Sequence, residues 1–280
     1  MNWIIASMLM FVCSVVMYLA IRKAQLIKIS IRTYSLFLFG VPAVILFFLN
    51  FGNFFVPIQY FLVILFGSIL FSYASNYFIQ KAVLLAPNPG YPLMISKSYV
   101  VFTTIVSIFL FGAGLTVKRA CGILLIVVFS GLIVYSKQHK KAKEHWFLYS
   151  MGAFFGWALL ALNSKFLLDR GVEVLQLLFY GFSIVTICLL IEIRVIKQKI
   201  RFNKKHLWLL LLIGLTSMLF NIFMQEGFKT APNIGYVNAV NTSSIAVVTI
   251  FSILLFKDEF SWKKLIGVFG VVVGLVLLIL

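Results

Sequence analysis

Ten long apolar runs, separated by short polar segments, dominate the pattern of hydrophobic and polar residues along this chain. Each run is about 20 residues long, and at 1.5 Å rise per residue a helix of that length crosses the hydrocarbon core of a bilayer. The pattern predicts an all-α polytopic membrane protein with ten transmembrane helices. The first run has no basic start, so we expect a membrane helix there and not a cleavable signal peptide. The predicted helices cover residues 2–21, 33–50, 57–80, 90–112, 120–136, 147–168, 174–193, 206–228, 234–256 and 264–280.

The chain contains an internal duplication. Residues 72–122 align without a gap with residues 217–267, at an offset of 145 positions, and 18 of the 51 pairs are identical. Shared polar and turn residues carry the argument, because shared apolar residues are expected by chance in so hydrophobic a chain. The duplication predicts two five-helix repeats, residues 1–136 and 146–280, joined by a basic linker at residues 137–145. The shared residues include Ser72, Asn76, Gln80, Pro87, Asn88, Gly90 and Tyr91, which meet Ser217, Asn221, Gln225, Pro232, Asn233, Gly235 and Tyr236.

Five helices per repeat is an odd number, so the two repeats must enter the membrane with opposite orientations. Inverted repeats related by an axis in the membrane plane can exchange conformations, and one side of the protein then opens as the other closes. The duplication therefore favours transport by alternating access.

Composition supports the membrane assignment, and the distribution of charge adds an orientation. The 280 residues are 62% hydrophobic and 11% charged, with a mean hydropathy of +1.08, which excludes an ordinary soluble domain. Of the 24 Lys and Arg, 18 fall in connections on one face, five on the other, and Lys97 lies within a span. By the positive-inside rule the rich face is cytoplasmic and both termini lie outside. The net charge of +17 is thus a topology determinant beside lipid headgroups, and we expect no nucleic-acid partner.

Polar residues inside four predicted helices form candidate substrate-binding stripes. Polar side chains within a membrane span are costly and normally face the bundle interior or a water-filled cavity. The alternative for each single residue is a structural role, because such side chains also join membrane helices by hydrogen bonds. As a set, we expect the stripes to line one central pathway. The candidates are Ser72, Asn76 and Gln80 in helix three, Ser96, Lys97 and Thr104 in helix four, Ser217, Asn221 and Gln225 in helix eight, and Asn238, Asn241, Thr242 and Thr249 in helix nine.

Lys97 breaks the symmetry between the repeats, because its counterpart is Thr242. The ammonium could extend along the helix to the cytoplasmic headgroups. If it does not, it is a cation in the cavity that can pair with a carboxylate or phosphate of a substrate. We therefore expect an anionic or zwitterionic small-molecule substrate.

The breaks before helices four and nine are candidate hinges or gates. Proline disfavours helix at the preceding residue, and Gly90 and Gly235 let the backbone turn or approach a neighbour. Tyr91 and Tyr236 follow directly, as interface anchors or as gates of the cavity. The plain alternative is a tight turn in each repeat.

Motifs of catalysis or metal binding are absent from the sequence. There are no paired carboxylates in mid-span, no His pair with metal spacing, and no nucleophile elbow or phosphate loop. The three cysteines lie within predicted spans, where packing explains them. We therefore expect no enzyme activity, no metal and no cofactor. Helices one and six also lack the buried carboxylate that cation/proton exchange in small multidrug exporters requires.

Each half resembles the EamA-type unit of the drug/metabolite transporter superfamily. Residues 76–122 and 221–267 carry the resemblance: an Ala-rich end of helix three, a polar break, and a Gly-rich helix five. The resemblance implies that helices three, four, eight and nine surround a translocation cavity. The sequence departs from the family pattern in two ways. The acidic residue after helix four is Glu259 in the second half but Gly114 in the first, and family members are usually drawn with cytoplasmic termini.

Together these features predict a secondary transporter in the cell (inner or plasma) membrane, with metabolite or amino-acid efflux as the leading function. Exchange of a nucleotide sugar or a phosphorylated sugar is the alternative that Lys97 encourages. From other classes, a lipid-modifying membrane enzyme and a non-transporting scaffold remain open. The sequence is compatible with a homodimer and leaves the substrate and coupling ion undefined.

Overall fold

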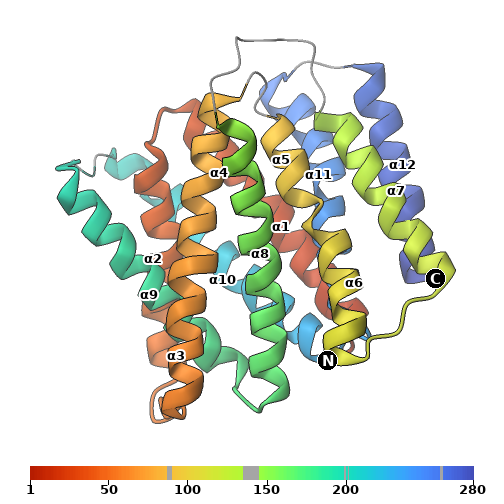
Figure 1. The fold of residues 1–280 in the computed structure, drawn as a ribbon. Coiled ribbons are helices and arrows are strands. Elements are labelled where there is room, and N and C mark those ends of the chain that lie inside the picture. Colours follow the sequence, from red (N-terminus) through yellow and green to blue (C-terminus); the bar gives the residue numbers. More distant parts are fainter. Residues whose placement is uncertain (87–89, 135–144, 199, 201, 259–260) are drawn as a thin grey trace.

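Ten helices long and apolar enough to cross a membrane make up the described part of the chain, as predicted. The computed structural model describes residues 1–86, 90–134, 145–198, 200, 202–258 and 261–280, and the described residues contain no strand. Figure 1 shows the helices side by side in one bundle, with both termini in its lower half. The ten-span, all-α prediction is confirmed.

Two of the five spans in the first half are composite. The third span joins α3, a π-helix η1 and α4, and the fourth joins α5 to α6 through Ser98. The bounds are α1 Trp3–Leu26, α2 Ile31–Leu49, α3 Ile58–Phe66, η1 Gly67–Tyr73, α4 Ala74–Leu85, α5 Gly90–Lys97, α6 Tyr99–Phe111 and α7 Val117–Val134. The first and third helices extend about a turn beyond the predicted ends, as is usual for sequence-based boundaries.

The second half is more regular, because each of its spans is a single α-helix apart from a short 3₁₀ turn, η2. The bounds are α8 Trp146–Asp169, α9 Val174–Val195, η2 Lys204–His206, α10 Leu207–Thr230, α11 Ile234–Phe256 and α12 Trp262–Ile279. The division at residues 136 and 146 stays a prediction, since residues 135–144 lie outside the described residues.

Local signals in the sequence set the helix ends. Asn233 is the N-cap of α11, with its side-chain Oδ1 accepting from the Gly235 N–H at 2.8 Å. Asn88, its counterpart, lies outside the described residues. The C-terminal ends repeat as well: Gly112 after α6 and Lys257 after α11 are both left-handed, with φ of 63° and 58°. Their N–H groups donate to the backbone carbonyls of Ser107 and Ser252. The same C-terminal cap therefore recurs 145 residues later in the chain.

The packing follows the repeats. Helix α1 packs along α10, and the symmetry-equivalent pair, α8 with η1 and α4, packs in the same way across the two repeats. Helix α2 packs on its own counterpart α9, and α7 packs on its counterpart α12. These contacts are those expected of two five-helix repeats in which each span of the first repeat is equivalent to the span five places later in the chain. The main buried core lies between the halves and includes Met10, Phe228 and Tyr236.

Small residues allow the closest of these contacts. At Gly156 of α8, a Cβ would collide with the Ser75 hydroxyl of α4. Glycine thus lets the two helix backbones approach, which is a common way to associate helices in a bilayer without a hydrophobic driving force.

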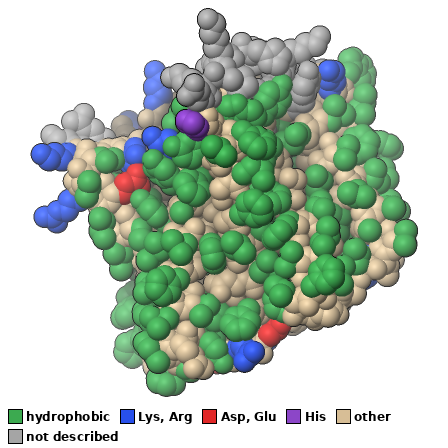
Figure 2. Space-filling view, in the orientation of Figure 1, with side chains coloured by type: hydrophobic (Ala, Val, Ile, Leu, Met, Phe, Trp, Pro, Cys, Tyr) green, Lys and Arg blue, Asp and Glu red, His purple; other side chains and the backbone are tan. Residues whose placement is uncertain are grey.

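The outer surface is apolar around the bundle, as lipid contact requires. Figure 2 shows hydrophobic side chains over most of the visible side, with Lys and Arg gathered mainly near the upper edge. Exposed side chains such as Phe48, Phe109 and Phe269 belong to this surface. The protein is therefore a multi-pass integral membrane protein.

The Lys- and Arg-rich face is predicted to be cytoplasmic, and cysteine labelling tests this. Lys197→Cys and Asn53→Cys place exposed thiols on opposite faces, in a background without the native cysteines. We expect a membrane-impermeant thiol reagent added to intact cells to label residue 53 and not residue 197. Permeabilised cells, in which both should react, provide the control. The reverse pattern would place both termini in the cytoplasm.

Candidate functional site

Lys97 lies at the end of α5 with its ammonium directed into the bundle, between α1 and α8. Its Nζ donates to the Tyr18 hydroxyl at 3.3 Å. The same nitrogen lies 5.4 Å from the centre of the Tyr18 ring and 5.9 Å from that of Trp157. No described carboxylate lies within ion-pair distance of it. Two aromatic faces and one hydroxyl therefore hold a cation whose charge is not neutralised by the described residues.

A chain of buried hydrogen bonds begins beside this cation. Tyr99, two residues after Lys97, donates from its hydroxyl to Asn238 Oδ1 at 3.2 Å. Asn238 Nδ2 in turn donates to the Thr103 hydroxyl at 3.2 Å, so α6 and α11 are joined in the bundle interior. The Tyr99 ring also meets Trp157 edge to face, at 6.4 Å between centroids. Lys97 and Asn238, both singled out from the sequence, thus belong to one polar cluster.

Two neighbouring acceptors on α11 have no hydrogen-bond partner among the described residues. Asn241 Oδ1 and Thr242 Oγ1 are both buried, at 5% and 3% residue exposure, and neither atom is bonded. Asn241 lies one helical turn after Asn238 and so shares its side of α11. Buried polar groups are normally paired, so such acceptors suit a ligand or water that donates hydrogen bonds.

The remaining predicted residues of the fourth and ninth spans have local partners. The Ser96 and Thr104 hydroxyls donate to the carbonyls of Leu93 and Val100. Thr249 donates to the Ile245 carbonyl at 2.7 Å. These bonds stay within one helix, as a structural role would require, and they leave the hydroxyl oxygens able to accept.

The polar stripe of the third span lies in a different setting from its repeat. Asn76 and Gln80 line a narrow cleft with Tyr73 and with residues of α2 and α9, including Glu192. Glu192 accepts from the Tyr73 hydroxyl at 3.1 Å and pairs with Arg32 at 2.9 Å. This cleft therefore lies against α2 and α9, next to an ion pair that joins them.

The third span also contains a π-helix that its counterpart α10 lacks. A π-turn contains about one residue more than an α-turn, so the residues that follow are rotated by about 100° relative to an uninterrupted helix. Gly67 begins η1, and a side chain there would collide with the Asn163 amide of α8. Asn163 Nδ2 approaches the Val63 carbonyl at 3.5 Å, just before the widened turn. The equivalent part of α10 is plain α-helix.

The stripe of α10 keeps its orientation toward the interior. Ser217 and Gln225 are buried at 3% and 5% exposure, and Gln225 Nε2 donates to Ser164 of α8 at 3.4 Å. Gln225 Oε1 has no described partner. Asn221 bonds back to the Ser217 carbonyl, as Asn76 does to that of Ser72. The local bonds are thus conserved between the repeats while the surroundings differ.

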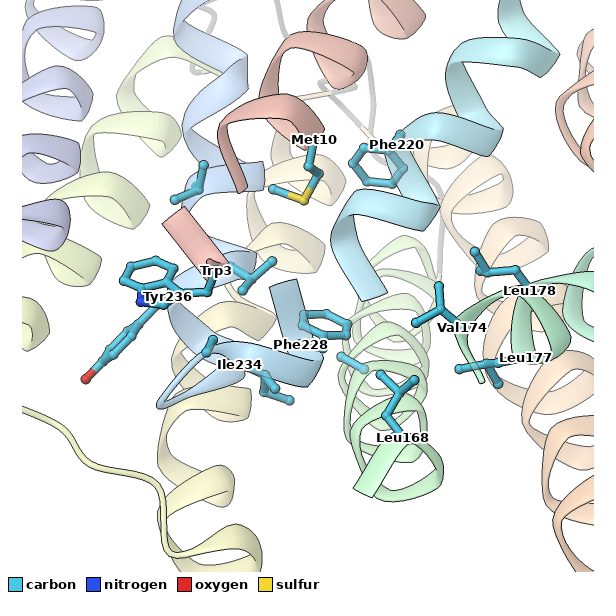
Figure 3. Close-up of a cluster of buried hydrophobic side chains, with 14 of the residues drawn as sticks. Trp3, Met10, Leu168, Val174, Leu177, Leu178, Phe220, Phe228, Ile234 and Tyr236 are labelled. Carbon is cyan, nitrogen blue, oxygen red and sulfur yellow. The ribbon is translucent and has the colours of Figure 1, made fainter. Parts of the chain in front are cut away.

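Gly235 and Tyr236 form a close helix crossing on the face opposite the Lys-rich one. A Cβ on Gly235 would lie 2.8 Å from the Thr104 Cα, so only glycine permits this contact of α11 with α6. Tyr236 is fully buried and donates to the Gly114 carbonyl at 2.6 Å. Figure 3 shows its ring beside that of Trp3, and the Arg119 guanidinium lies 4.9 Å from the Tyr236 ring. Tyr236 therefore joins the start of α11 to the segment between α6 and α7.

The first-repeat break is described only in part. Pro87 and Pro89 lie outside the described residues, and of Gly90 the structure gives its place as the first residue of α5. Tyr91 is half-buried with its ring 6.3 Å from that of Trp146, at the start of α8. Tyr91 thus contacts the second repeat on the Lys-rich face.

Four residues of the polar cluster were not singled out from the sequence. Tyr18, Trp157, Tyr99 and Thr103 are aromatic or hydroxyl residues in apolar spans, where packing is the ordinary expectation. Only their convergence on Lys97 and Asn238 gives them a role at the site. Among the described residues, no group of three His, Cys, Asp or Glu could hold a metal ion.

Comparisons with known proteins agree with this architecture. Residues 145–280 match the sequence profile of the EamA-like transporter family. An "Uncharacterized transporter" of Archaeoglobus fulgidus is 24% identical over 185 residues, which are 66% of this chain and 64% of that relative. The chain therefore spans less than two thirds of the relative it matches.

The fold itself has a solved counterpart. One crystal structure superposes with a TM-score of 0.79 at 12% identity, and the match covers 98% of this chain and 97% of the other. At so low an identity the likeness concerns the fold alone. It extends over both halves of the chain, including the half that the family profile does not match.

Proposed function

Because residues 145–280 match the EamA-like transporter family, we propose that the protein is a secondary transporter of a small anionic or zwitterionic metabolite. Amino-acid or metabolite efflux across the cell membrane is the form that we favour. The cluster around Lys97 is the proposed substrate site.

The Lys97 ammonium carries this proposal. A half-buried charge with no counter-ion among the described residues is costly, and it attracts an anionic group strongly in surroundings of low dielectric constant. The cage of Tyr18 and Trp157 stabilises the ammonium while the site is empty. A substrate carboxylate beside Nζ would supply the missing counter-charge.

The neighbouring acceptors favour a zwitterion over a simple anion. The unpaired oxygens of Asn241 and Thr242 can accept from a substrate ammonium or amide group. A carboxylate near Lys97 and a donor near α11 would together satisfy groups that the described residues leave unsatisfied. This pattern of donor and acceptors is complementary to an amino acid.

The repeats supply the proposed mechanism. Helices α1 and α11 of the site form one packing pair, and α8 and α6 form the symmetry-equivalent pair; each pair takes one helix from each repeat. Rocking of one pair against the other would expose the same site first to one face and then to the other. The chemistry of the site involves binding and release, with no covalent step.

Reconstitution into liposomes tests the proposal. We expect purified protein to move labelled amino acids out of preloaded vesicles faster than protein-free vesicles release them. Preloading in parallel with hexose phosphates and nucleotide sugars tests the alternative substrates. A folded protein that accelerates none of these solutes would contradict the proposed function and favour a scaffold or a membrane enzyme.

A further inference from the structure

A second cavity lies near the end of the bundle opposite the Lys-rich face, away from Lys97. It has a volume of about 160 Å³ and is bounded by the end of α6, the end of α8 and the α10–α11 connection. Its charged lining residues are Lys165 and Asp169, and apolar walls come from Phe111, Ala113 and Ile234. Figure 3 shows Ile234 close to Phe228 and near Leu168 of α8, so the cavity lies against the packed core.

The pseudo-symmetry shows what occupies the equivalent place at the other face. Helices α1 and α8 both have 24 residues and both begin with tryptophan, which aligns Arg22 of α1 with Lys165 of α8. The offset of 145 aligns Asp258, after α11, with Ala113, after α6. On the Lys-rich face Arg22 and Asp258 form an ion pair of 2.7 Å that joins α1 to the end of α11.

At the opposite face the cation remains and the acid is missing. Lys165 lines the cavity, and alanine stands where the other repeat has its aspartate. Lys165 pairs instead within its own helix, with Asp169 Oδ1 at 2.8 Å. The cavity is therefore found at the position equivalent to that of the Arg22–Asp258 ion pair, which bridges α1 and the end of α11 at the other face.

Lys165 and Asp169 retain the capacity to bind a ligand. An ammonium has three N–H donors and a carboxylate about four acceptor positions, and the pair uses one of each. The Lys165 side chain is only 14% exposed while that of Asp169 is 43% exposed. The other polar side chains of the wall are committed: Asn233 bonds to the Thr104 carbonyl and the Gly235 N–H, and Ser107 bonds to the Thr103 carbonyl.

We propose that this cavity is a second, separate binding site for a zwitterion, with its carboxylate on Lys165 and its ammonium on Asp169. The ligand would take the place that the aspartate fills in the other repeat, and the four charges would alternate in sign. At about 30 Å³ for each water, the cavity holds roughly five waters, a volume suited to a small α-amino acid. Its role as a station on the transport path rests on the proposed function, whereas binding itself does not.

Binding of labelled L-alanine to purified protein tests the site. The background is Lys97→Met, which removes the cation of the first site. We expect saturable binding to persist in this background and to weaken at least tenfold on adding Ala113→Asp, because the new carboxylate would pair with Lys165 and fill the cavity. Ala113→Asn, of equal size and without charge, should weaken binding less.

Asp169→Asn and ligand analogues complete the design. Asp169→Asn should weaken L-alanine binding at least tenfold, while acetate and methylamine, which carry one charge each, should compete poorly. Absence of saturable binding in the Lys97→Met background, or binding unchanged by Ala113→Asp, would overturn the second site. Failure of transport in liposomes with this binding intact would refute the proposed function and leave the site in place.

Discussion

Replacement of Lys97 by methionine is expected to reduce transport roughly 10- to 100-fold. Hydrogen bonds to a charged group contribute about 1.5–3 kcal/mol, and each 1.4 kcal/mol corresponds to about a factor of ten. The variant would leave a substrate carboxylate without a counter-charge among Tyr18, Trp157 and Tyr99. Initial rates of efflux from liposomes, at equal amounts of reconstituted protein, give the measurement.

The fold should survive this change, which makes the result interpretable. Methionine keeps the apolar length of the side chain, and its sulfur packs favourably against the Tyr18 and Trp157 rings. We expect membrane expression and melting temperature to stay near those of the parent protein. Full transport activity of Lys97→Met would remove Lys97 from the substrate site.

Two neutral variants provide a matched comparison. Asn76→Leu and Asn221→Leu each remove one uncharged amide, which contributes about 0.5–1.5 kcal/mol. In the structure both amides bond to a carbonyl of their own helix. Their effects on transport should therefore be smaller than that of Lys97→Met, at about tenfold or less.

Gly274→Val is expected to destabilise the protein by about 1–3 kcal/mol, the usual cost of overfilling a packed contact. A Cβ on Gly274 would lie 2.8 Å from the Gly122 carbonyl oxygen, and one on Gly122 would lie 2.7 Å from that of Gly274. These obstacles are backbone atoms of α7 and α12, so the two helices must move apart. Thermal unfolding in detergent, followed by the loss of monodisperse protein, measures the effect.

Gly114→Ala is the matched control for this prediction. Gly114 has open space at its Cβ position, with no heavy atom of a neighbour within 4 Å. Alanine there should leave the melting temperature nearly unchanged. Equal stability of Gly274→Val and Gly114→Ala would show that α7 and α12 do not depend on this close approach.

The number of helices and the duplication could be read from the sequence because both are properties of contiguous residues. Each apolar run fixes its own span, since backbone hydrogen bonds in a bilayer must be satisfied within the helix. The repeated Ser107 and Ser252 caps show how closely the local signals agree between the halves. The π-helix at Gly67–Tyr73 did not follow from the sequence, because no local pattern distinguishes it from the plain helix of the other repeat.

The sequence by itself determined that this is a ten-helix membrane protein built from two related halves, and it singled out Lys97 as the cation that breaks their symmetry. Only the tertiary structure placed Tyr18 and Trp157 around that cation, since they come from α1 and α8, far from residue 97 in the chain. The alignment already paired Ala113 with Asp258, yet the meaning of the missing acid depended on where Arg22 and Lys165 lie. Hydropathy and repetition act along the chain, whereas a site is made by side chains that helix packing brings together from separate spans.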